Sequence, residues 1–270
     1  MVLLKFCITF IFIASLSSSI INAQDEHNSP FNLDETREAL LLGTGALVGV
    51  AGLTLTLNLQ PLTVDQVNAL NPADVNSFDR SAIGPIEKES TEDILLYASF
   101  AFPLSFLAFE ETRDDFPKLL LMYGEVLLIS GSLNGIVKGI TKRTRPYVYS
   151  DETPMDDRTT TAARVSFYSG HTSLSAAITF FTANVFTSYI SDKTTRIIIW
   201  SAAALYPAVI GYLRVESSSH FPTDVIVGYI VGAGIGFLIP ELHRVQKENN
   251  FSFNTMLYED GGGLGITVNF

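Results

Sequence analysis

Six stretches with little or no charge, separated by charged and turn-forming residues, constrain this chain more than any other feature. They are Ala39–Val64, Ile94–Phe109, Leu119–Val137, Thr172–Ser191, Ile197–Leu213 and Val225–Pro240. Their lengths predict six helices, and hence an all-α protein built as a six-helix bundle.

The length of these stretches also bears on whether the bundle crosses a membrane. A spanning helix needs about 20 apolar residues. Ala39–Val64 and Thr172–Ser191 reach that length, whereas the others are near or below it, and several stretches carry Ser, Thr or Asn. The mean hydropathy of +0.28 is high for a soluble protein and low for one that is mostly membrane. We favour a transmembrane bundle, with a soluble helical bundle as the alternative.

The N-terminus has the features of a secretory signal peptide over residues 1–23. Lys5 precedes an apolar core, Phe6–Ala14, and Ile21-Asn22-Ala23 offers a small residue before Gln24. An uncleaved first membrane helix is the alternative. The signal predicts an exported protein, either multi-pass in the cell membrane or, for a soluble bundle, periplasmic.

The rest of the chain divides into a polar lead-in over 24–38, a helical-bundle domain over 39–245 and a tail over 246–270. If the signal is cleaved, three spans place the basic loop Lys138–Arg164 in the cytoplasm, as the positive-inside rule favours. These cations equally suit an anionic substrate, so the side that the loop faces stays open.

The tail differs from the bundle in its residue pattern. Phe251–Tyr258 and Leu264–Phe270 alternate apolar and polar residues around a segment with three glycines. This alternation predicts a short β-hairpin-like tail, while a frayed end is the alternative because isolated hairpins are marginal in water.

The charge of the chain argues against a nucleic-acid partner, and its cysteine content excludes disulfides and cysteine metal sites within the chain. The net charge of −11 argues against nucleic acid, because a phosphate backbone needs a basic face. Cys7 is the only cysteine, so the chain has no internal disulfide and no cysteine metal site.

Lys138 and Arg145 form the first of three groups that suit a phosphate ligand. Seven residues are close to two helical turns, so both cations can lie on one helix face, and Pro146 then ends the helix. Arg offers a forked donor set and Lys a point charge for phosphate oxygens. Considered alone, they also fit a basic cluster flanking a membrane helix.

Ser169-Gly170-His171 form the second group, just before an apolar helical stretch. Ser and Gly at a helix start leave backbone N–H groups that bind anions, and Gly170 allows close approach. His171 is placed to donate a proton to a leaving oxygen. An ordinary N-cap with a surface histidine is the alternative.

Arg214, His220 and Asp224 form the third group. A four-residue spacing lets a helical turn place the Asp224 carboxylate beside the His220 imidazole, where it would fix the tautomer and strengthen the nucleophile. Arg214 would add a third cation. A polar turn between two helices is the alternative.

Taken together and in this order, the three groups resemble the type 2 phosphatidic acid phosphatase superfamily, which includes bacterial class A acid phosphatases and vanadium-dependent haloperoxidases. The family pattern is Lys-x6-Arg-Pro, then Pro-Ser-Gly-His, then Ser-Arg-x5-His-x3-Asp. Here Tyr168 stands where the family has proline and Leu213 where it has serine. The likeness covers roughly Leu119–Leu242.

The resemblance implies a metal-independent phosphatase that works through a phosphohistidine, with no cofactor. His220 would be the nucleophile, Asp224 its orienting carboxylate and His171 the proton donor. The phosphate would be held by Lys138, Arg145, Ser169, Gly170 and Arg214. These fixed donors would stabilise the transferring phosphoryl group, and three side-chain cations would do what Mg²⁺ does elsewhere.

The expected substrate is a phosphate monoester or pyrophosphate, and a lipid phosphate if the helices span: phosphatidate, an isoprenyl pyrophosphate or a lipid A phosphate. A soluble periplasmic acid phosphatase is the alternative, ahead of a vanadium-dependent haloperoxidase or an inactive lipid-phosphate binder.

Three further titratable residues lie outside these groups. Glu125 is either a functional acid or a structural partner of Asn134, Asp79 is expected to pair with Arg80, and His243 is expected to be solvated.

Overall fold

The computed structural model describes residues 29–87, 91–245, 251–258 and 261–268. The predicted signal peptide, residues 1–23, lies outside this part of the chain and stays a prediction. The proposed division into lead-in, bundle domain and tail also stays a prediction.

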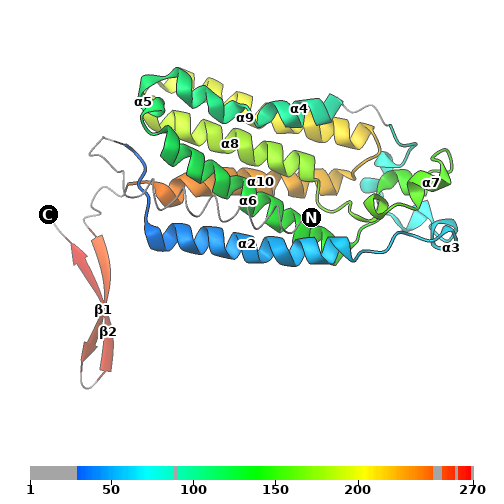
Figure 1. Cartoon of the computed structure of the whole chain (residues 1–270), viewed down its shortest axis with the longest axis horizontal. Coiled ribbons are helices and arrows are strands. Elements are labelled where there is room, and N and C mark those ends of the chain that lie inside the picture. The colour runs from blue at the N-terminus through cyan, green and yellow to red at the C-terminus, as the bar shows by residue number, and fades with distance from the viewer. Residues whose placement is uncertain (1–28, 88–90, 246–250, 259–260, 269–270) are drawn as a thin grey trace.

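Long helices lying side by side form the body of the described structure (Figure 1). They are α2 (Glu35–Leu57), α6 (Phe116–Thr141), α8 (Gly170–Tyr189), α9 (Lys193–Glu216) and α10 (Pro222–His243). The all-α prediction for the bundle is confirmed. α6, α9 and α10 each contain one predicted apolar stretch and α8 nearly does, whereas α2 ends at Leu57, seven residues before the predicted end of Ala39–Val64.

Local chemistry sets the helix ends. Asp34, Ser169 and Asp192 are the N-caps of α2, α8 and α9, and each side chain accepts a hydrogen bond from a backbone N–H of the first turn. Pro222 begins α10, where its missing N–H costs nothing. Lys142 ends α6 in the left-handed conformation, with φ of 48°.

The stretch predicted as the second helix, Ile94–Phe109, does not form a single helix. It divides into α4 (Thr91–Ser99) and a 3-10 helix, η3 (Phe102–Ala108), which the short α5 (Glu110–Arg113) follows. Pro103 lies in the first turn of η3, and it can neither donate a backbone hydrogen bond nor continue the preceding helix without a clash. The predicted count of six helices is therefore not confirmed.

Close helix packing fixes the position of α8 against α10. A Cβ added to Gly228 of α10 would lie 2.6 Å from the carbonyl oxygen of Ser169, and Gly232 and Gly236 face the α8 backbone at Ser173 and Ala177 in the same way. Such small residues at four-residue spacing let two backbones approach closely. The N-terminus of α8 is thereby held against the start of α10.

Within the described residues, four helices are long and apolar enough to cross a membrane: α2, the segment that begins with α6, α9 and α10. Their outer faces carry exposed large apolar side chains, among them Leu47, Ile198, Leu205 and Ile230. Apolar surface of this extent marks contact with lipid or protein rather than with water. These features support a membrane location.

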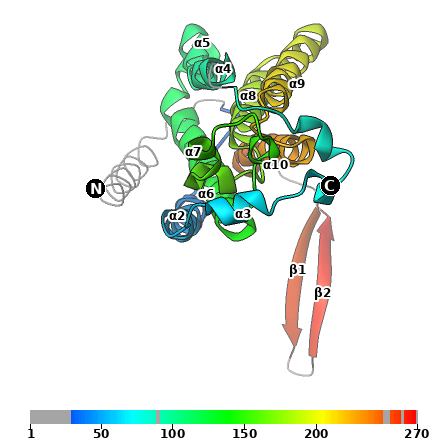
Figure 2. The same cartoon turned by 90° about the vertical axis from the view of Figure 1, so that its right-hand side faces the viewer.

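Short elements and loops cluster at one end of the bundle, on the right of Figure 1 and facing the viewer in Figure 2. They are α3 (Val64–Asn68), η1 (Pro72–Asp74), η2 (Asp79–Ala82), η4 (Pro146–Tyr149), α7 (Met155–Arg158) and η5 (Thr161–Arg164). The C-terminus of α6 and the N-termini of α4, α8 and α10 meet at this end.

Two strands follow the bundle. β1 (Phe251–Tyr258) pairs antiparallel with β2 (Gly261–Val268), with Phe251 opposite Val268 and Tyr258 opposite Gly261. The turn residues 259–260 lie outside the described part of the chain, so the complete hairpin stays a prediction.

Candidate active site

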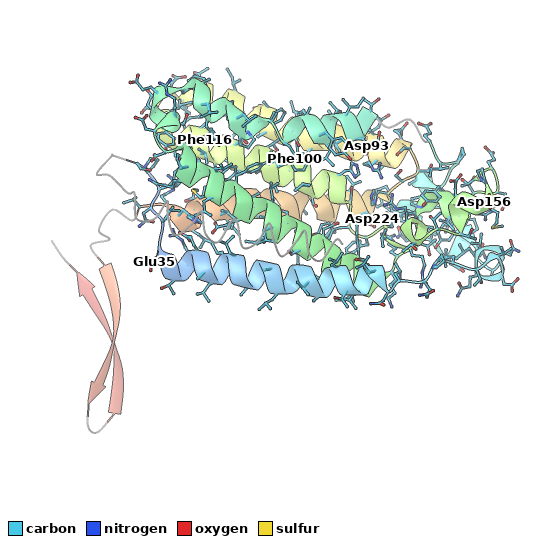
Figure 3. All side chains as sticks on the ribbon, in the orientation of Figure 1. Glu35, Asp93, Phe100, Phe116, Asp156 and Asp224 are labelled. Atoms are coloured by element: carbon cyan, nitrogen blue, oxygen red, sulfur yellow. The ribbon has the colours of Figure 1, made fainter. Side chains whose placement is uncertain are left out.

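The residues of the three sequence groups come together at the loop-covered end of the bundle. They come from the end of α6, the start of η4, the start of α8, the end of α9 and the start of α10. Figure 3 shows Asp93 and Asp224 at this end, with Glu35 and Phe116 at the opposite end. Residues that are far apart in the sequence therefore face one site.

Lys138 and Gly170 are immediate neighbours in this site. The Lys138 Nζ atom lies 3.3 Å from the position that a Cβ on Gly170 would take, and the Asn134 Oδ1 atom lies 3.0 Å from it. A side chain at position 170 would therefore push against the lysine. The absence of a side chain lets the backbone at the start of α8 approach the cation.

Ser169 ends the loop before α8 and begins the helix. Its side chain is fully buried, its Oγ lies 2.9 Å from the Oγ1 of Thr172, and its backbone N–H donates to the carbonyl oxygen of Asp224. The free N–H groups and the dipole at a helix start favour an anion. The α8 start is thus tied to the α10 start beside the three cations.

Arg214 is buried near the end of α9 and meets a carboxylate that the sequence analysis did not select. Its Nη1 donates to the Oε1 of Glu92, 3.0 Å away, and Ser217 donates to the same oxygen. The Arg214 Nε has no hydrogen-bond partner among the described residues. Among the described residues, Arg145 makes one hydrogen bond, from its Nη1 to the carbonyl oxygen of Ser219 over 3.3 Å, so both guanidinium groups retain donors without a partner there.

His220 lies at the centre of the site, in the turn between α9 and α10. It is 0% exposed, its Nδ1 lies 3.5 Å from the Oδ2 of Asp224, and both ring nitrogens lack a closer partner among the described residues. Burial, followed by the charges of Arg145, Arg214 and Lys138, holds the pKa of His220 well below its usual value. The imidazole is therefore neutral, as a nucleophile must be.

His171 occupies the first turn of α8 and makes a contact that the sequence did not reveal. Its Nε2 lies 2.5 Å from the Oδ1 of Asp93, near the start of α4. Burial and the positive charge of Arg214 lower the pKa of His171 to about 4, while the hydrogen bond and charge of Asp93 act in the opposite direction. A bound phosphate anion would offset the cations and favour the protonated imidazole.

Asp224 is held by a second layer of polar contacts. Arg143 donates to its Oδ1 over 2.5 Å, Ser166 donates to its Oδ2, and the backbone N–H of Phe221 donates to the same oxygen. Arg143 also donates to Asp79, which accepts from the side chain and backbone of Thr223. Burial raises the pKa of Asp79, but the hydrogen bonds outweigh it and hold that pKa below its usual value.

Three interpretations from the sequence need correction. Asp79 pairs with Arg143, whereas Arg80 donates to backbone carbonyls of Ala73 and Val75. Asn134 bonds the carbonyl oxygen of Tyr168 rather than Glu125. His243 is fully buried rather than solvated. The sequence separation of these residues gave no signal for the actual pairings.

The loop that lacks the family's proline is nevertheless anchored. The Asn134 side chain donates to the carbonyl oxygen of Tyr168 over 3.0 Å, and the Tyr168 ring is almost fully buried. The backbone N–H of Ser166 donates to the carbonyl oxygen of Arg143. Tertiary contacts thus position the Ser169 cap where a proline would otherwise restrict the chain.

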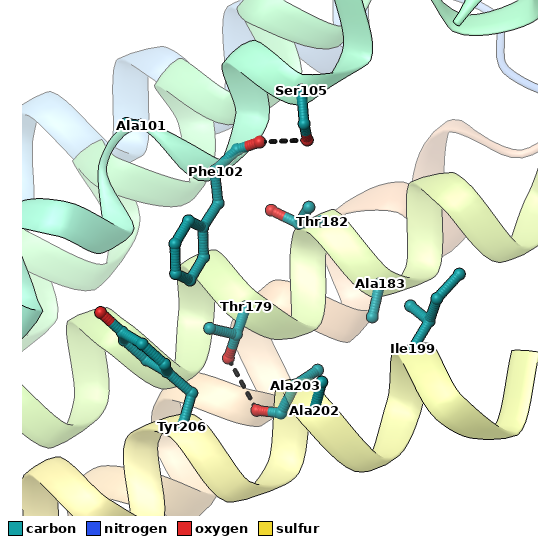
Figure 4. A pocket seen from close by; sticks show the side chains of 10 residues that line it. All are labelled: Ala101, Phe102, Ser105, Thr179, Thr182, Ala183, Ile199, Ala202, Ala203 and Tyr206. Atoms are coloured by element: carbon teal, nitrogen blue, oxygen red, sulfur yellow. Dashed lines mark hydrogen bonds between the residues drawn. The ribbon is translucent and has the colours of Figure 1, made fainter. Parts of the chain in front are cut away.

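A pocket of about 390 Å³ lies on the flank of the bundle, between η3, α8 and α9 (Figure 4). Mostly apolar side chains line it, including Phe102, Ala203 and Tyr206, and Thr179 bonds across to the α9 backbone. Along α8, Thr179 lies about 12 Å from His171 at the helical rise per residue. The pocket therefore lies deeper in the apolar part of the bundle than the polar site.

A helical bundle with membrane-length helices and a cationic histidine–aspartate site at one end defines the class of this protein. Residues 119–248 match the sequence model of the PAP2 superfamily. This segment contains all three residue groups of the site, so the region that forms the site matches the PAP2 superfamily.

Two curated relatives share a shorter region with the chain. They are the phospholipid phosphatase-related protein type 3 of Rattus norvegicus and that of Homo sapiens, each 31% identical over 105 residues. This region is 38% of the present chain and only 15% of either relative. Among solved structures, a transmembrane PAP2 type phosphatidylglycerolphosphate phosphatase from Bacillus subtilis aligns with 91% of this chain and 98% of its own at 16% identity, with a TM-score of 0.43.

Proposed function

We propose that this protein is a metal-independent phosphatase that hydrolyses phosphate monoesters or pyrophosphates of lipids through a phosphohistidine intermediate. The observation that carries the proposal is the placement of His220. A neutral, fully buried imidazole lies beside a carboxylate and within the field of Lys138, Arg145 and Arg214. Phosphoryl transfer to nitrogen requires this combination of an uncharged nucleophile and fixed cations.

In the first step, a nitrogen of His220 attacks phosphorus and the bond from phosphorus to the leaving oxygen breaks. The Nδ1 side faces Asp224, so Nε2 is the attacking atom and Asp224 balances the charge that develops on the ring. His171 gives its proton to the leaving oxygen, which departs as an alcohol or, from a pyrophosphate, as a phosphate.

In the second step, His171 takes a proton from water and the resulting hydroxide attacks phosphorus. The bond from phosphorus to His220 breaks, and inorganic phosphate leaves. Asp93 supports this exchange because its carboxylate favours the protonated form of His171. The same imidazole therefore serves as acid and then as base.

The phosphate oxygens would be held by Lys138, Arg145, Arg214, Ser169 and the backbone N–H of Gly170. Unused guanidinium donors of Arg145 and Arg214, together with the N-terminus of α8, support this assignment. Glu92 accepts from the Nη1 of Arg214, so the other donors of this guanidinium group would contact the phosphate.

A lipid substrate is favoured by the surroundings of the site. Membrane-length helices surround it, and the apolar pocket of Figure 4 offers space for part of an acyl or prenyl chain below the polar end. The names of the curated relatives also refer to phospholipid phosphatase. A soluble periplasmic acid phosphatase is less well supported, because the outer helix faces expose large apolar side chains.

The test is phosphate release by the purified full chain in detergent with EDTA. Wild type, His220→Ala and a surface control, Lys193→Ala, are compared on phosphatidate, an isoprenyl pyrophosphate and p-nitrophenyl phosphate. We expect activity in wild type and control, none in His220→Ala, and a preference for a lipid. Preference for p-nitrophenyl phosphate would indicate a general acid phosphatase. Folded protein inactive on all three would contradict the proposal, and halide oxidation with vanadate and peroxide would then test the haloperoxidase alternative.

A further inference from the structure

A second cluster of titratable side chains lies at the end of the bundle opposite the candidate active site. Glu38 is in the first turn of α2, Glu125 is within the apolar part of α6, and His243 is the last residue of α10. Glu35, at the start of the same helix as Glu38, marks this end in Figure 3. The cluster therefore has no part in the chemistry proposed above.

The three side chains meet in the interior. Glu38 is 2% exposed, whereas Glu125 and His243 are 0% exposed. The Nε2 of His243 lies 3.2 Å from the Oε2 of Glu125 and 3.4 Å from the Oε2 of Glu38. One atom from each residue lies within 4.8 Å of the other two.

The orientation of His243 aims a ring nitrogen at both carboxylates. Its Nδ1 lies 2.7 Å from the carbonyl oxygen of Ile239, which can only accept a hydrogen bond, so Nδ1 carries a proton. Nε2 is then the atom that faces Glu38 and Glu125. A backbone hydrogen bond at one ring nitrogen is the usual way in which a metal-binding histidine is oriented.

Glu125 lacks the partners that a buried carboxylate normally has. By hydrogen-bond geometry, neither of its oxygens has a partner among the described residues. The Nε2 of His243 also has no hydrogen-bond partner among them. Glu38, in contrast, accepts from the Asp34 backbone and pairs with Arg37. Among the described residues, the basic side chain nearest to Glu125 is the His243 ring, 3.2 Å away. A buried carboxylate needs a cation close by, and this cluster can bind one between its three side chains.

The two distances from the His243 Nε2 to the carboxylates are compatible with the spacing of ligands around a metal ion. An N–H···O bond prefers about 2.9 Å. Ligands bound to Zn²⁺ at about 2.0–2.1 Å in a tetrahedron are about 3.3 Å apart. The observed 3.2 Å and 3.4 Å agree with that ligand spacing.

We propose that Glu38, Glu125 and His243 bind one divalent transition-metal ion of the Zn²⁺ type, which joins α2, α6 and α10 at the end of the bundle remote from the active site. Two carboxylates and an imidazole supply three ligands and leave a fourth position for water. The role is structural, because binding one ion fixes three helices that are far apart in the sequence. Sequence reasoning missed the site because its residues share no local motif.

The competing explanation is a protonated His243 held between the two carboxylates. With Arg37, this arrangement has two positive and two negative charges and needs no metal. It makes a different prediction, since such a cluster would bind no ion.

The experiment uses full-length protein without a histidine tag, purified in detergent and dialysed against metal-free buffer. It is loaded with Zn²⁺ or Co²⁺, and bound metal is measured by mass spectrometry. We expect one ion per chain, a visible Co²⁺ spectrum typical of four-coordination, and an unfolding temperature that rises with Zn²⁺. Glu125→Gln and His243→Gln should lose all three signals.

Glu241→Gln is the matched control, because Glu241 lies in the same last turn of α10 but pairs with Arg244 outside the cluster. It should bind the ion like wild type. Absence of bound metal in the folded wild type, or undiminished binding in Glu125→Gln, would overturn the proposal. Glu125→Gln keeps the shape of the side chain, so it still tests metal binding by the cluster if His243→Gln fails to fold.

Discussion

The Nε2 atom of His171 lies 2.5 Å from the Oδ1 atom of Asp93, although α4 and α8 contribute these residues from positions 78 apart in the sequence. The contact brings a carboxylate to the proposed acid–base residue from outside the segment that matches the PAP2 superfamily. We infer that Asp93 positions His171 and favours its protonated form.

Asp93→Asn tests this role through the pH dependence of phosphate release. The substitution removes a charge that raises the pKa of His171, so the protonated acid becomes scarcer. We expect the alkaline limb of the pH–rate profile to move to lower pH by about one unit, with a rate loss of about tenfold at pH 7. Steady-state rates between pH 5 and 8 measure both effects.

The control for this substitution is Asp156→Asn, which neutralises an exposed carboxylate at the same end of the bundle (Figure 3). It should leave the profile unchanged. An equal loss of rate at every pH in Asp93→Asn would show that the residue has only a structural role.

Arg143→Ala tests the contacts behind Asp224. Arg143 bridges Asp224 and Asp79, whose side chains are 0% and 1% exposed, so its removal leaves two buried carboxylates without their cation. We expect a loss of about 3–5 kcal/mol in the free energy of unfolding. Thermal unfolding in detergent, compared with the exposed Arg113→Ala, provides the measurement.

The double variant Arg143→Ala with Asp79→Asn separates unpaired charge from lost packing. It should recover part of the stability, because one uncompensated carboxylate is removed. Asp79→Asn alone would also be measured. If it lowers the free energy of unfolding by the same amount in Arg143→Ala as in wild type, this explanation would be contradicted.

Much of the bundle was predictable because helix length and apolar content are local properties. The stretch Ile94–Phe109 was misjudged, since Pro103 interrupts a segment whose composition otherwise favours one helix. The composition of the stretch is dominated by its apolar residues, so it does not reveal the effect of Pro103, which removes a backbone hydrogen-bond donor. Membrane length was predicted only in part: it was assigned to the stretches of α2 and α8, but the four candidate spans are α2, the segment that begins with α6, α9 and α10, and α8 is not among them.

The candidate site was predictable only where its residues have fixed spacing. Lys138 and Arg145, or His220 and Asp224, share a segment, and their separation suggests a common face. Asp93 and Asp79 lie in acidic segments that resemble many solvated loops, so nothing in the sequence distinguished them. Their roles depend on tertiary packing, which brings the starts of α4 and η2 to the ends of the other helices.

Gly228→Ala tests whether the packing of α10 on α8 positions the phosphate-binding loop. The added methyl group would lie 2.6 Å from the Ser169 carbonyl oxygen, so the two helices must move apart. We expect a loss of about 1–3 kcal/mol in the free energy of unfolding. Phosphate release should fall as well, because Ser169 and Gly170 would shift.

Gly234→Ala is the matched control on the same helix, since its added methyl group meets nothing within 4 Å. It should leave activity intact and keep or raise stability by about 0.5–1 kcal/mol, because alanine favours the helix. Equal effects of the two substitutions would contradict the packing argument.

The stability of the protein should decrease as the pH falls from about 7 to 5. His171 and His220 lie outside the four membrane-length helices, and both have a lowered pKa, about 4 for His171. Burial and the neighbouring cations therefore keep both imidazoles neutral in the folded protein. In the unfolded chain they take up protons near pH 6.5. Between these pKa values the unfolded state binds more protons, so acid favours unfolding by about 1.4 kcal/mol per pH unit for each imidazole.

Thermal unfolding of wild type and His171→Gln at a series of pH values provides the measurement. The pH dependence of the variant should be smaller than that of wild type by the share of one imidazole, about 1.4 kcal/mol per pH unit. Orthovanadate, an anion that would offset the three cations, should reduce the dependence in wild type by raising the pKa of both imidazoles. An identical pH dependence in wild type and His171→Gln would contradict the neutral state assigned to His171 in the folded protein.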